Sequence, residues 1–228
     1  MDEPALLIIM ARRPEPGRAK TRLCPPLTLE EAAHLYEGML RDTLELVHGV
    51  AGVAPAIAVS PAGSEDYFRT LAPDALLIDQ GEGDLGVRLA HTTASAFAYG
   101  ARAVAVMSSD SPAVTVDALG QAFHLLADHD LVLGPSEDGG YYLAAIARPI
   151  PALFTEVVMS TPRVLHDTLA VAARLGLRVA LLPSSYDVDS AADLARLQSD
   201  PAPLVHTRAA LDRIGGLKTE HPPSLPPG

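Results

Sequence analysis

The chain has 228 residues, of which 48% are hydrophobic, and it carries a formal net charge of −11. This length and apolar content predict one folded domain with a sizeable core and exclude a disordered chain. The negative charge opposes binding to nucleic acid or to an anionic membrane surface, so any phosphate chemistry must use a local basic pocket.

The cysteine content and the N-terminal segment exclude further classes of protein. Cys24 is the single cysteine, which excludes an intramolecular disulfide framework, and no motif supports a catalytic thiol there. The segment "MDEPALLIIMARR" begins with acidic residues, and its apolar stretch is too short to span a membrane. We therefore expect a cytoplasmic protein with no membrane partner.

Short apolar segments alternate with helical patterns along the whole chain. The predicted strands are 5–10, 55–60, 75–79, 103–110, 131–136, 141–146 and 178–183. The predicted helices are 29–48, 64–72, about 85–99, 116–128, about 161–175 and 190–198. The helix over 29–48 is the best defined, because Thr28 and Glu31 form a capping-box pattern ahead of apolar residues at helical spacing.

This alternation predicts an α/β fold with a mostly parallel central sheet and helices on both faces. We expect the domain to cover residues 1–198 and a Pro-rich tail to cover 199–228. In open α/β sheets ligands bind at the carboxyl ends of the strands. The polar loops that follow the strands are therefore the candidate functional segments.

The segment "ARRPEPGRAKTRL", residues 11–23, follows the first predicted strand and concentrates basic charge. Pro14, Pro16 and Gly17 favour an irregular backbone there. Its basic residues are Arg12, Arg13, Arg18, Lys20 and Arg22, against the single acid Glu15. Guanidinium and ammonium groups at the carboxyl end of a strand suit the phosphates of a nucleotide. The alternative is a solvated basic loop that offsets local acidic charge, and the position after the first strand favours phosphate binding.

Two acidic motifs also follow predicted strands. "SSDSP" places Asp110 after the fourth strand, and "DVDSAADL" places Asp187 and Asp189 before the last predicted helix. Carboxylates from separate strand ends can converge on a divalent cation, so we predict a metal site formed by Asp110 and Asp189. The alternative is that each of these two residues caps the helix that follows it.

The segment "SEDGGYYL", residues 136–143, lies between two predicted strands. Gly139 and Gly140 allow the backbone to approach a ligand closely or to adopt positive φ. Asp138 could bind an acceptor hydroxyl or act as a base. The alternative is an ordinary turn, in which Asp and Gly are common.

The segment "GEGDLG", residues 81–86, matches a dinucleotide-binding pattern but is a poor candidate for that role. Glu82 and Asp84 would lie against a pyrophosphate, and the motif follows the third strand instead of the first. We instead predict that this segment positions substrate, with Asp84 contacting a base or sugar hydroxyl and Arg88 contacting an anion.

Taken in order, these motifs resemble a GT-A-like family of nucleotide-diphospho-sugar transferases. The resemblance spans about residues 5–198 and is carried by "RRPEPGRAKTRL", "GDLGVRL", "SSDSP", "SEDGGYYL", "ST" at 160–161 and "DVDSAADL". The first motif and the "MLRDTL" helix also resemble the 2-phospho-lactate guanylyltransferases. The resemblance implies a GT-A/nucleotidyltransferase Rossmann-like three-layer α/β/α sandwich and transfer from a nucleotide donor that depends on Mg²⁺ or Mn²⁺.

The resemblance also implies roles for individual residues. Asp110 matches the metal-binding aspartate, Asp189 resembles the second metal carboxylate, and Lys20 and Arg22 match the phosphate-binding residues of "KTRL". Together with the loop analysis above, this makes Asp110, Asp138 and Lys20 the expected catalytic residues. Residues expected on the nucleotide and phosphate side are Arg12, Arg13, Gly17, Lys20, Arg22, Asp84 and Arg88. Residues expected on the substrate side are Gly139, Gly140, Tyr141, Ser160 and Thr161.

Two positions depart from the family pattern. Arg12 stands where the family has a lysine, which retains the charge, and Met159 stands where it has a tryptophan. The second change removes an aromatic platform and leaves the acceptor open.

Three functions follow from the sequence. The first is nucleotidyl transfer, in which a small phosphorylated acceptor attacks the α-phosphorus of a nucleoside triphosphate and pyrophosphate leaves. The second is glycosyl transfer from a nucleotide-diphospho-sugar to a small acceptor, and the third is a non-catalytic nucleotide-binding module. Five basic residues and two separated metal carboxylates favour the first, whereas the family resemblance favours the second. A nucleotide and a small acceptor are the expected partners, with no nucleic acid, and the oligomeric state stays open.

Overall fold

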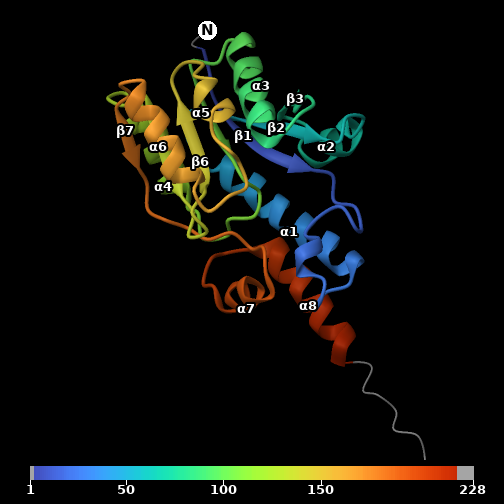
Figure 1. Cartoon of the computed structure of the whole chain (residues 1–228). Coiled ribbons are helices and arrows are strands. Elements are labelled where there is room, and N and C mark those ends of the chain that lie inside the picture. The colour runs from blue at the N-terminus through green and yellow to red at the C-terminus, as the bar shows by residue number, and fades with distance from the viewer. Residues whose placement is uncertain (1–2, 220–228) are drawn as a thin grey trace, which may run out of the picture.

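The computed structural model describes residues 3–219 and is built around a seven-stranded sheet (Figure 1). The strand order is β3-β2-β1-β4-β6-β5-β7. The strands are β1 (Ala5–Arg12), β2 (Val53–Ser60), β3 (Leu76–Asp79), β4 (Ala103–Met107), β5 (Leu131–Pro135), β6 (Tyr141–Ile146) and β7 (Val179–Leu181). Within residues 3–219, β6 alone runs antiparallel to its neighbours, because the five residues 136–140 between β5 and β6 are too few for a parallel crossover. The predicted α/β class with a mostly parallel sheet is confirmed.

Helices cover both faces of the sheet and complete three layers (Figure 1). The α-helices are α1 (Leu29–His48), α2 (Glu65–Leu71), α3 (Leu85–Ala98), α4 (Val116–Leu125), α5 (Ala152–Thr155), α6 (Val164–Arg174), α7 (Ala191–Ser199) and α8 (Val205–Thr219). A short 3₁₀ helix, η1, covers Thr21–Leu23.

Side chains of β1 alternate between two cores because successive residues of a strand point to opposite faces. Leu6 and Ile8 pack with residues of α3, α5 and α6 on one face. Leu7 and Ile9 pack with residues of α1, α2 and α4 on the other. All four side chains are buried, which is why the strand reads as a continuous apolar run.

The predicted helix over 29–48 matches α1 at both ends. Thr28 accepts a hydrogen bond from the Glu31 backbone N–H at 3.1 Å, and the Glu31 carboxylate accepts one from the Thr28 N–H at 2.7 Å. The capping box expected from the sequence is therefore present. No helix within residues 3–219 is both long and apolar enough to cross a membrane.

Part of the predicted Pro-rich tail forms the helix α8, which packs along α1 (Figure 1). The last residues of that tail, 220–228, lie outside the described part of the chain. Gly38 permits the close approach, since a Cβ there would lie 2.8 Å from the carbonyl oxygen of His206. The sequence did not predict this helix, nor α5 or η1.

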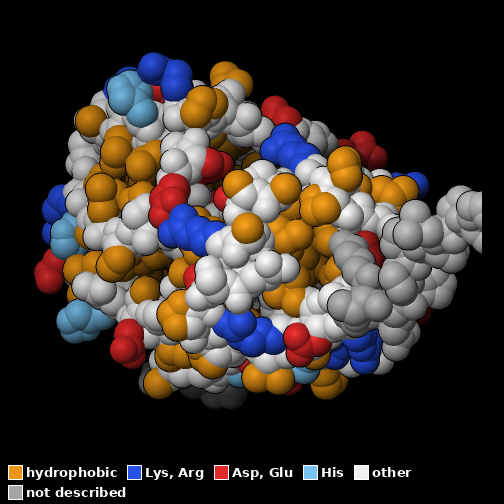
Figure 2. Space-filling view, turned by 90° about the horizontal axis from the view of Figure 1, so that it is seen from below, with side chains coloured by type: hydrophobic (Ala, Val, Ile, Leu, Met, Phe, Trp, Pro, Cys, Tyr) orange, Lys and Arg blue, Asp and Glu red, His pale blue; other side chains and the backbone are white. Residues whose placement is uncertain are grey.

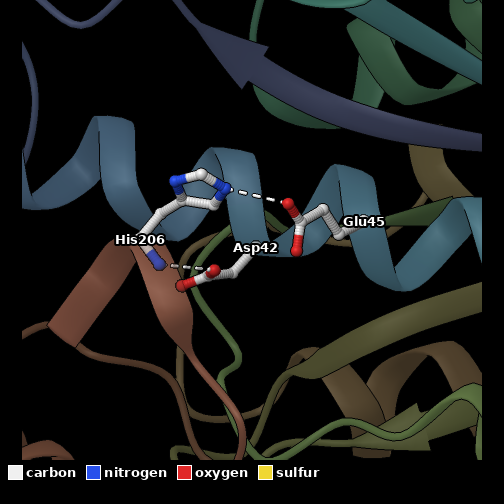
Figure 3. A group of neighbouring side chains, drawn as sticks. All are labelled: Asp42, Glu45 and His206. Carbon is white, nitrogen blue, oxygen red and sulfur yellow. Dashed lines mark hydrogen bonds and ion pairs between the residues drawn. The ribbon is translucent and has the colours of Figure 1, made fainter. Parts of the chain in front are cut away.

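Asp42 of α1 caps the first turn of α8. Its carboxylate, buried in the contact, accepts hydrogen bonds from the backbone N–H groups of His206 at 2.9 Å and Thr207 at 2.8 Å. The His206 ring pairs with Glu45 at 2.9 Å (Figure 3). A negative charge at the start of a helix satisfies free N–H groups and complements the helix dipole.

Replacing Asp42 by alanine is expected to lower the free energy of unfolding by about 2 kcal/mol, because one buried and one partly buried N–H group lose a charged acceptor. Urea unfolding measures this change. Glu45→Ala is the matched control, since its exposed pair with His206 contributes about 0.5 kcal/mol or less. Equal losses in the two variants would show that Asp42 does not anchor α8.

His48 closes α1 and links it to the loop before β3. Its ring nitrogens lie 2.7 Å from the Leu44 carbonyl oxygen and 2.9 Å from Asp74. Partial burial lowers the pKa of His48, but the hydrogen bonds to Asp74 and Leu44 and the nearby negative charges outweigh it, so the pKa is raised. The charged ring stabilises the fold below its ordinary pKa of about 6.5, and this contribution is lost as pH rises through the folded pKa.

Asp74→Asn is therefore expected to destabilise the protein by about 0.5 kcal/mol or less at pH 5.5 and by still less at pH 8.5, because solvent screens this exposed pair. Urea unfolding at the two pH values measures the difference. An effect that grows with pH would contradict the assignment.

Candidate active site

A cavity of about 600 Å³ opens at the carboxyl ends of β1, β2 and β4, beside the start of β6. This is the edge of the sheet where the sequence predicted ligand binding. Ten predicted site residues line it: Arg12, Arg22, Arg88, Asp110, Asp138, Gly140, Tyr141, Ser160, Thr161 and Asp189.

Lys20 joins the two predicted metal carboxylates at the edge of this cavity. Its Nζ donates to Asp110 Oδ2 at 2.5 Å and to Asp189 Oδ1 at 2.7 Å. The Lys20 side chain is only 8% exposed. Burial lowers the pKa of Lys20, but the charges and hydrogen bonds of the two carboxylates outweigh it and the pKa is raised. Lys20 therefore stays protonated at neutral pH.

A small hydrophobic cluster holds these three residues together. It packs the basic loop, the first half of α1 and the 186–197 segment against one another through Ala19, Leu23, Leu27, Leu35, Tyr36, Tyr186, Val188 and Leu194, among others. Lys20 has φ of 49°, so the chain turns sharply between the buried residues Ala19 and Leu23. The Val188 N–H donates to the Asp110 carbonyl oxygen at 3.0 Å, which fixes Asp189 beside Asp110.

The helix-capping alternatives for Asp110 and Asp189 do not hold. Thr115 caps α4, with its side chain accepting from the Ala118 N–H. Ser190 caps α7 in a capping box with Asp193. The structure assigns the caps to neighbouring residues and turns the two carboxylates toward Lys20.

Asp187 lies in the same cavity, although the sequence interpretation gave it no role. Its two carboxylate oxygens accept hydrogen bonds from the hydroxyl groups of Ser111 and Ser136. Burial and the charge of Asp110 raise the pKa of Asp187 to about 6, against the opposing effect of the two hydroxyls. The "DVD" motif held a partial signal, because the sequence already placed Asp187 beside Asp189, ahead of the last predicted helix.

Tyr36 is a second cavity residue that the sequence did not single out. The Arg12 backbone N–H donates to its hydroxyl oxygen at 3.1 Å, and the same hydroxyl lies 3.0 Å from the Ser109 hydroxyl. Tyr36 thus connects the end of β1 to the loop that carries Asp110. Its spacing on α1 indicated only a core position.

Five predicted site residues are not among those that line the cavity, and Lys20, at its edge, is one of them. Arg13 pairs with Glu15 at 3.5 Å and lies over the Tyr67 ring. Asp84 caps α3 by accepting from the Val87 N–H at 2.9 Å. Gly17 and Gly139 are also absent from the residues that line the cavity. Their predicted roles in ligand binding stay predictions.

Gly139 brings two lining segments together. Its φ is +90°, and a Cβ there would lie 2.1 Å from the Pro162 carbonyl oxygen. The close approach puts the 138–141 segment beside Ser160 and Thr161. Asp138 accepts from the Gly140 N–H at 2.9 Å, so the turn predicted as the alternative is present, while the Asp138 side chain lines the cavity.

The basic residues do not form a continuous positive surface on the face viewed from below in Figure 2. Lys and Arg side chains alternate there with Asp and Glu side chains and with hydrophobic ones. This pattern suits a small anionic ligand held in the cavity better than a long polyanion.

Asp42, Glu45 and His206 form a second group of possible metal ligands, with ligand atoms within 4.8 Å of one another (Figure 3). This group lies in the α1–α8 contact, and the capping of α8 accounts for the position of Asp42.

Comparison with known proteins agrees with the fold and the motifs. A family model described as "Uncharacterized protein conserved in bacteria (DUF2064)" matches residues 43–161, and no curated protein matches the sequence. A protein from Desulfovibrio desulfuricans G20, proposed to be a nucleotide-diphospho-sugar transferase, is similar in structure with a TM-score of 0.84. It is 27% identical, and 96% of this chain and 98% of that chain are covered. The resemblance inferred from the motifs is confirmed.

Two more distant structures share the fold. CMP:2-keto-3-deoxy-manno-octonic acid synthetase complexed with CTP has a TM-score of 0.52 and 15% identity, over 86% of this chain and 98% of that one. Rv0371c from Mycobacterium tuberculosis H37Rv, in complex with manganese, has a TM-score of 0.55 and 15% identity, over 88% of this chain and 100% of that one. At this identity the likeness establishes the fold alone, that of the GT-A-like nucleotidyltransferases.

Proposed function

This chain belongs to the DUF2064 family, and from that premise we propose that it is a metal-dependent nucleotidyltransferase acting on a small phosphorylated acceptor. The Lys20–Asp110–Asp189 cluster at the edge of the 600 Å³ cavity is the observation that carries the proposal. The structural neighbours support a transferase enzyme that uses a nucleotide.

The charges around the cavity suit a nucleoside triphosphate. Arg12 and Arg22 line one wall, and Arg22 Nη1 lies 3.8 Å from Asp189 Oδ2, with its side chain 81% exposed. Arg12 is exposed and forms no side-chain ion pair within residues 3–219, so its guanidinium is available to an anion. Guanidinium groups bind phosphate oxygens in bidentate fashion, which orients the triphosphate.

The proposed step is an in-line displacement. An oxygen of the acceptor phosphate forms a bond to the α-phosphorus, the bond from that phosphorus to the bridging oxygen breaks, and pyrophosphate leaves with the electron pair. The side chains contribute by position and charge: Arg12, Arg22 and Lys20 offset negative charge, and Asp138 faces the acceptor side.

Asp110 and Asp189 suit a divalent cation. Both offer hard carboxylate oxygens, and the pair already binds one positive group, the Lys20 ammonium, through one oxygen of each. The two residues are about one-fifth and one-half exposed, so their remaining oxygens can be reached from solvent. Bound Mg²⁺ or Mn²⁺ would neutralise charge on the phosphates. The manganese complex of Rv0371c supports a divalent metal without indicating which one.

Glycosyl transfer is the second candidate, and the likeness to the Desulfovibrio protein favours it. In that case the cation would neutralise charge on the diphosphate of a nucleotide-sugar, and an acceptor hydroxyl would attack the anomeric carbon and give up its proton to a base. The bond from that carbon to the diphosphate oxygen would break, and the nucleoside diphosphate would leave with the electron pair. The cavity, the carboxylates and the basic wall would serve both reactions. The two functions differ in the donor and in the bond that breaks.

Thermal-shift screening with Mg²⁺ or Mn²⁺ separates the candidates. Each nucleoside triphosphate and each nucleotide-sugar is tested, and pyrophosphate release is then assayed with the best ligand and candidate phosphorylated acceptors. Stabilisation by nucleoside triphosphates and release of pyrophosphate support nucleotidyl transfer. Stabilisation by nucleotide-sugars alone would contradict it and favour glycosyl transfer, and no stabilisation by any nucleotide would exclude both.

A further inference from the structure

Gln80, the residue that follows β3, is buried in the wall of the cavity, with 5% of its surface exposed. Its Nε2 donates to the Ala58 carbonyl oxygen of β2 at 2.7 Å and to the Ala11 carbonyl oxygen of β1 at 3.2 Å. One side chain therefore ties together the ends of three adjacent strands.

These two bonds fix the orientation of the Gln80 amide. Both acceptors are carbonyl oxygens, so the NH₂ group must face the strands and the Oε1 atom must face the other way. Oε1 accepts from Arg88 Nη1 at 3.1 Å. The reversed amide would place oxygen against two carbonyl oxygens and NH₂ against a guanidinium, so the alternative orientation is excluded on charge.

The position of Arg88 in turn depends on this amide. Its Nε lies 3.4 Å from the Asp84 carbonyl oxygen, at the outer limit of a hydrogen bond, so Gln80 supplies the shorter contact. Arg88 is half-buried and lines the cavity. With one donor directed at Gln80 and one at Asp84, three of its five N–H groups remain to contact a ligand.

Arg88 lies on the β3 side of the cavity, since its helix α3 follows β3, whereas Asp110 follows β4. These two strands are three spacings apart in the sheet, roughly 14 Å, and the Gln80 amide reaches part of that way, to the Ala11 carbonyl oxygen of β1. A nucleotide whose phosphates face Lys20 and Arg22 would direct its base toward Arg88. Guanidinium groups bind base edges that present hydrogen-bond acceptors, as they do at O6 and N7 of guanine.

We propose that Gln80 is the positioning residue that fixes Arg88 for contact with an acceptor-bearing edge of the nucleotide's base. This inference rests on the proposed function, since it requires a bound nucleotide. In this arrangement Arg88 contacts the base and so selects among bases, and Gln80 sets the direction in which the Arg88 N–H groups point.

A double-mutant cycle tests the inference. Calorimetry with Mg²⁺ measures the affinity of the best-binding member of ATP, GTP, CTP and UTP for wild type, Gln80→Met, Arg88→Met and the double variant. Each single change is expected to weaken binding about 10-fold, the loss of one charged hydrogen bond. The double variant is expected to bind no more weakly than Arg88→Met, because Gln80 acts through Arg88.

Two controls separate positioning from other effects. Arg69→Met removes an exposed arginine that is not among the residues lining the cavity and is expected to leave affinity unchanged. Inorganic tripolyphosphate, which has no base, is expected to bind wild type and Gln80→Met equally. An equal loss for tripolyphosphate would place Arg88 on the phosphates and overturn the inference.

The remaining outcomes are also decisive. If Gln80→Met lowers nucleotide affinity by the same factor in the wild-type and Arg88→Met backgrounds, Gln80 does not act through Arg88 and its role is merely structural. If Gln80→Met leaves nucleotide affinity unchanged, Gln80 has no part in binding. Wild type that binds no nucleotide would overturn both this inference and the proposed function. If Gln80→Met does not fold, Gln80→Asn, whose shorter side chain withdraws the oxygen from Arg88, is measured in the same cycle.

Discussion

Asp110→Asn is expected to lower metal-dependent turnover by about 10²–10³-fold while the protein stays folded. The change removes one of two carboxylates that face the proposed cation and the phosphates. Lys20 keeps its 2.7 Å contact with Asp189, which retains part of the local structure. Pyrophosphate release measures turnover, and circular dichroism checks the fold.

Asp117→Asn is the matched control for Asp110→Asn. Asp117 lies only seven residues further on, in the first turn of α4, and is exposed outside the cavity. It is expected to retain full turnover. Turnover that survives Asp110→Asn unchanged would remove Asp110 from the active site.

Lys20→Met is expected to lower the free energy of unfolding by about 3 kcal/mol at neutral pH, because it leaves Asp110 and Asp189 without their shared cation. This expected loss of about 3 kcal/mol is at the low end of what breaking a buried ion pair costs, because Asp189 is 48% exposed and solvent screens part of its charge. Urea unfolding gives the change, and turnover is expected to fall with it.

Arg22→Met provides the comparison for Lys20→Met. Arg22 reaches the same Asp189 at 3.8 Å but is 81% exposed, so its loss is expected to cost about 0.5 kcal/mol or less. The double variant Lys20→Met/Asp110→Asn is expected to recover part of the stability, because one uncompensated charge is removed. Equal costs for Lys20 and Arg22, or no recovery, would contradict the central position of Lys20.

The regular elements were predictable from local sequence because their signals are local. The capping box of Thr28 and Glu31 and the apolar spacing behind it defined α1 at both ends. The apolar runs of β1 and β6 indicated buried strands. The helix α8 was not predictable, since Pro201 and Pro203 precede it and its sequence has little helical periodicity.

The sequence alone determined the α/β class, the loops that carry chemistry, and the candidate residues Lys20, Asp110 and Asp189. Residue types and their position after strands were sufficient for that. Only the tertiary structure decided that Lys20 lies between the two carboxylates, that Arg13 and Asp84 lie off the cavity wall, and that Asp187 and Gln80 lie on it. The bonds of Lys20 to the two carboxylates and of Gln80 to Ala11 join residues 69 to 169 positions apart, and sequence periodicity carries no information on which side chains meet across such separations.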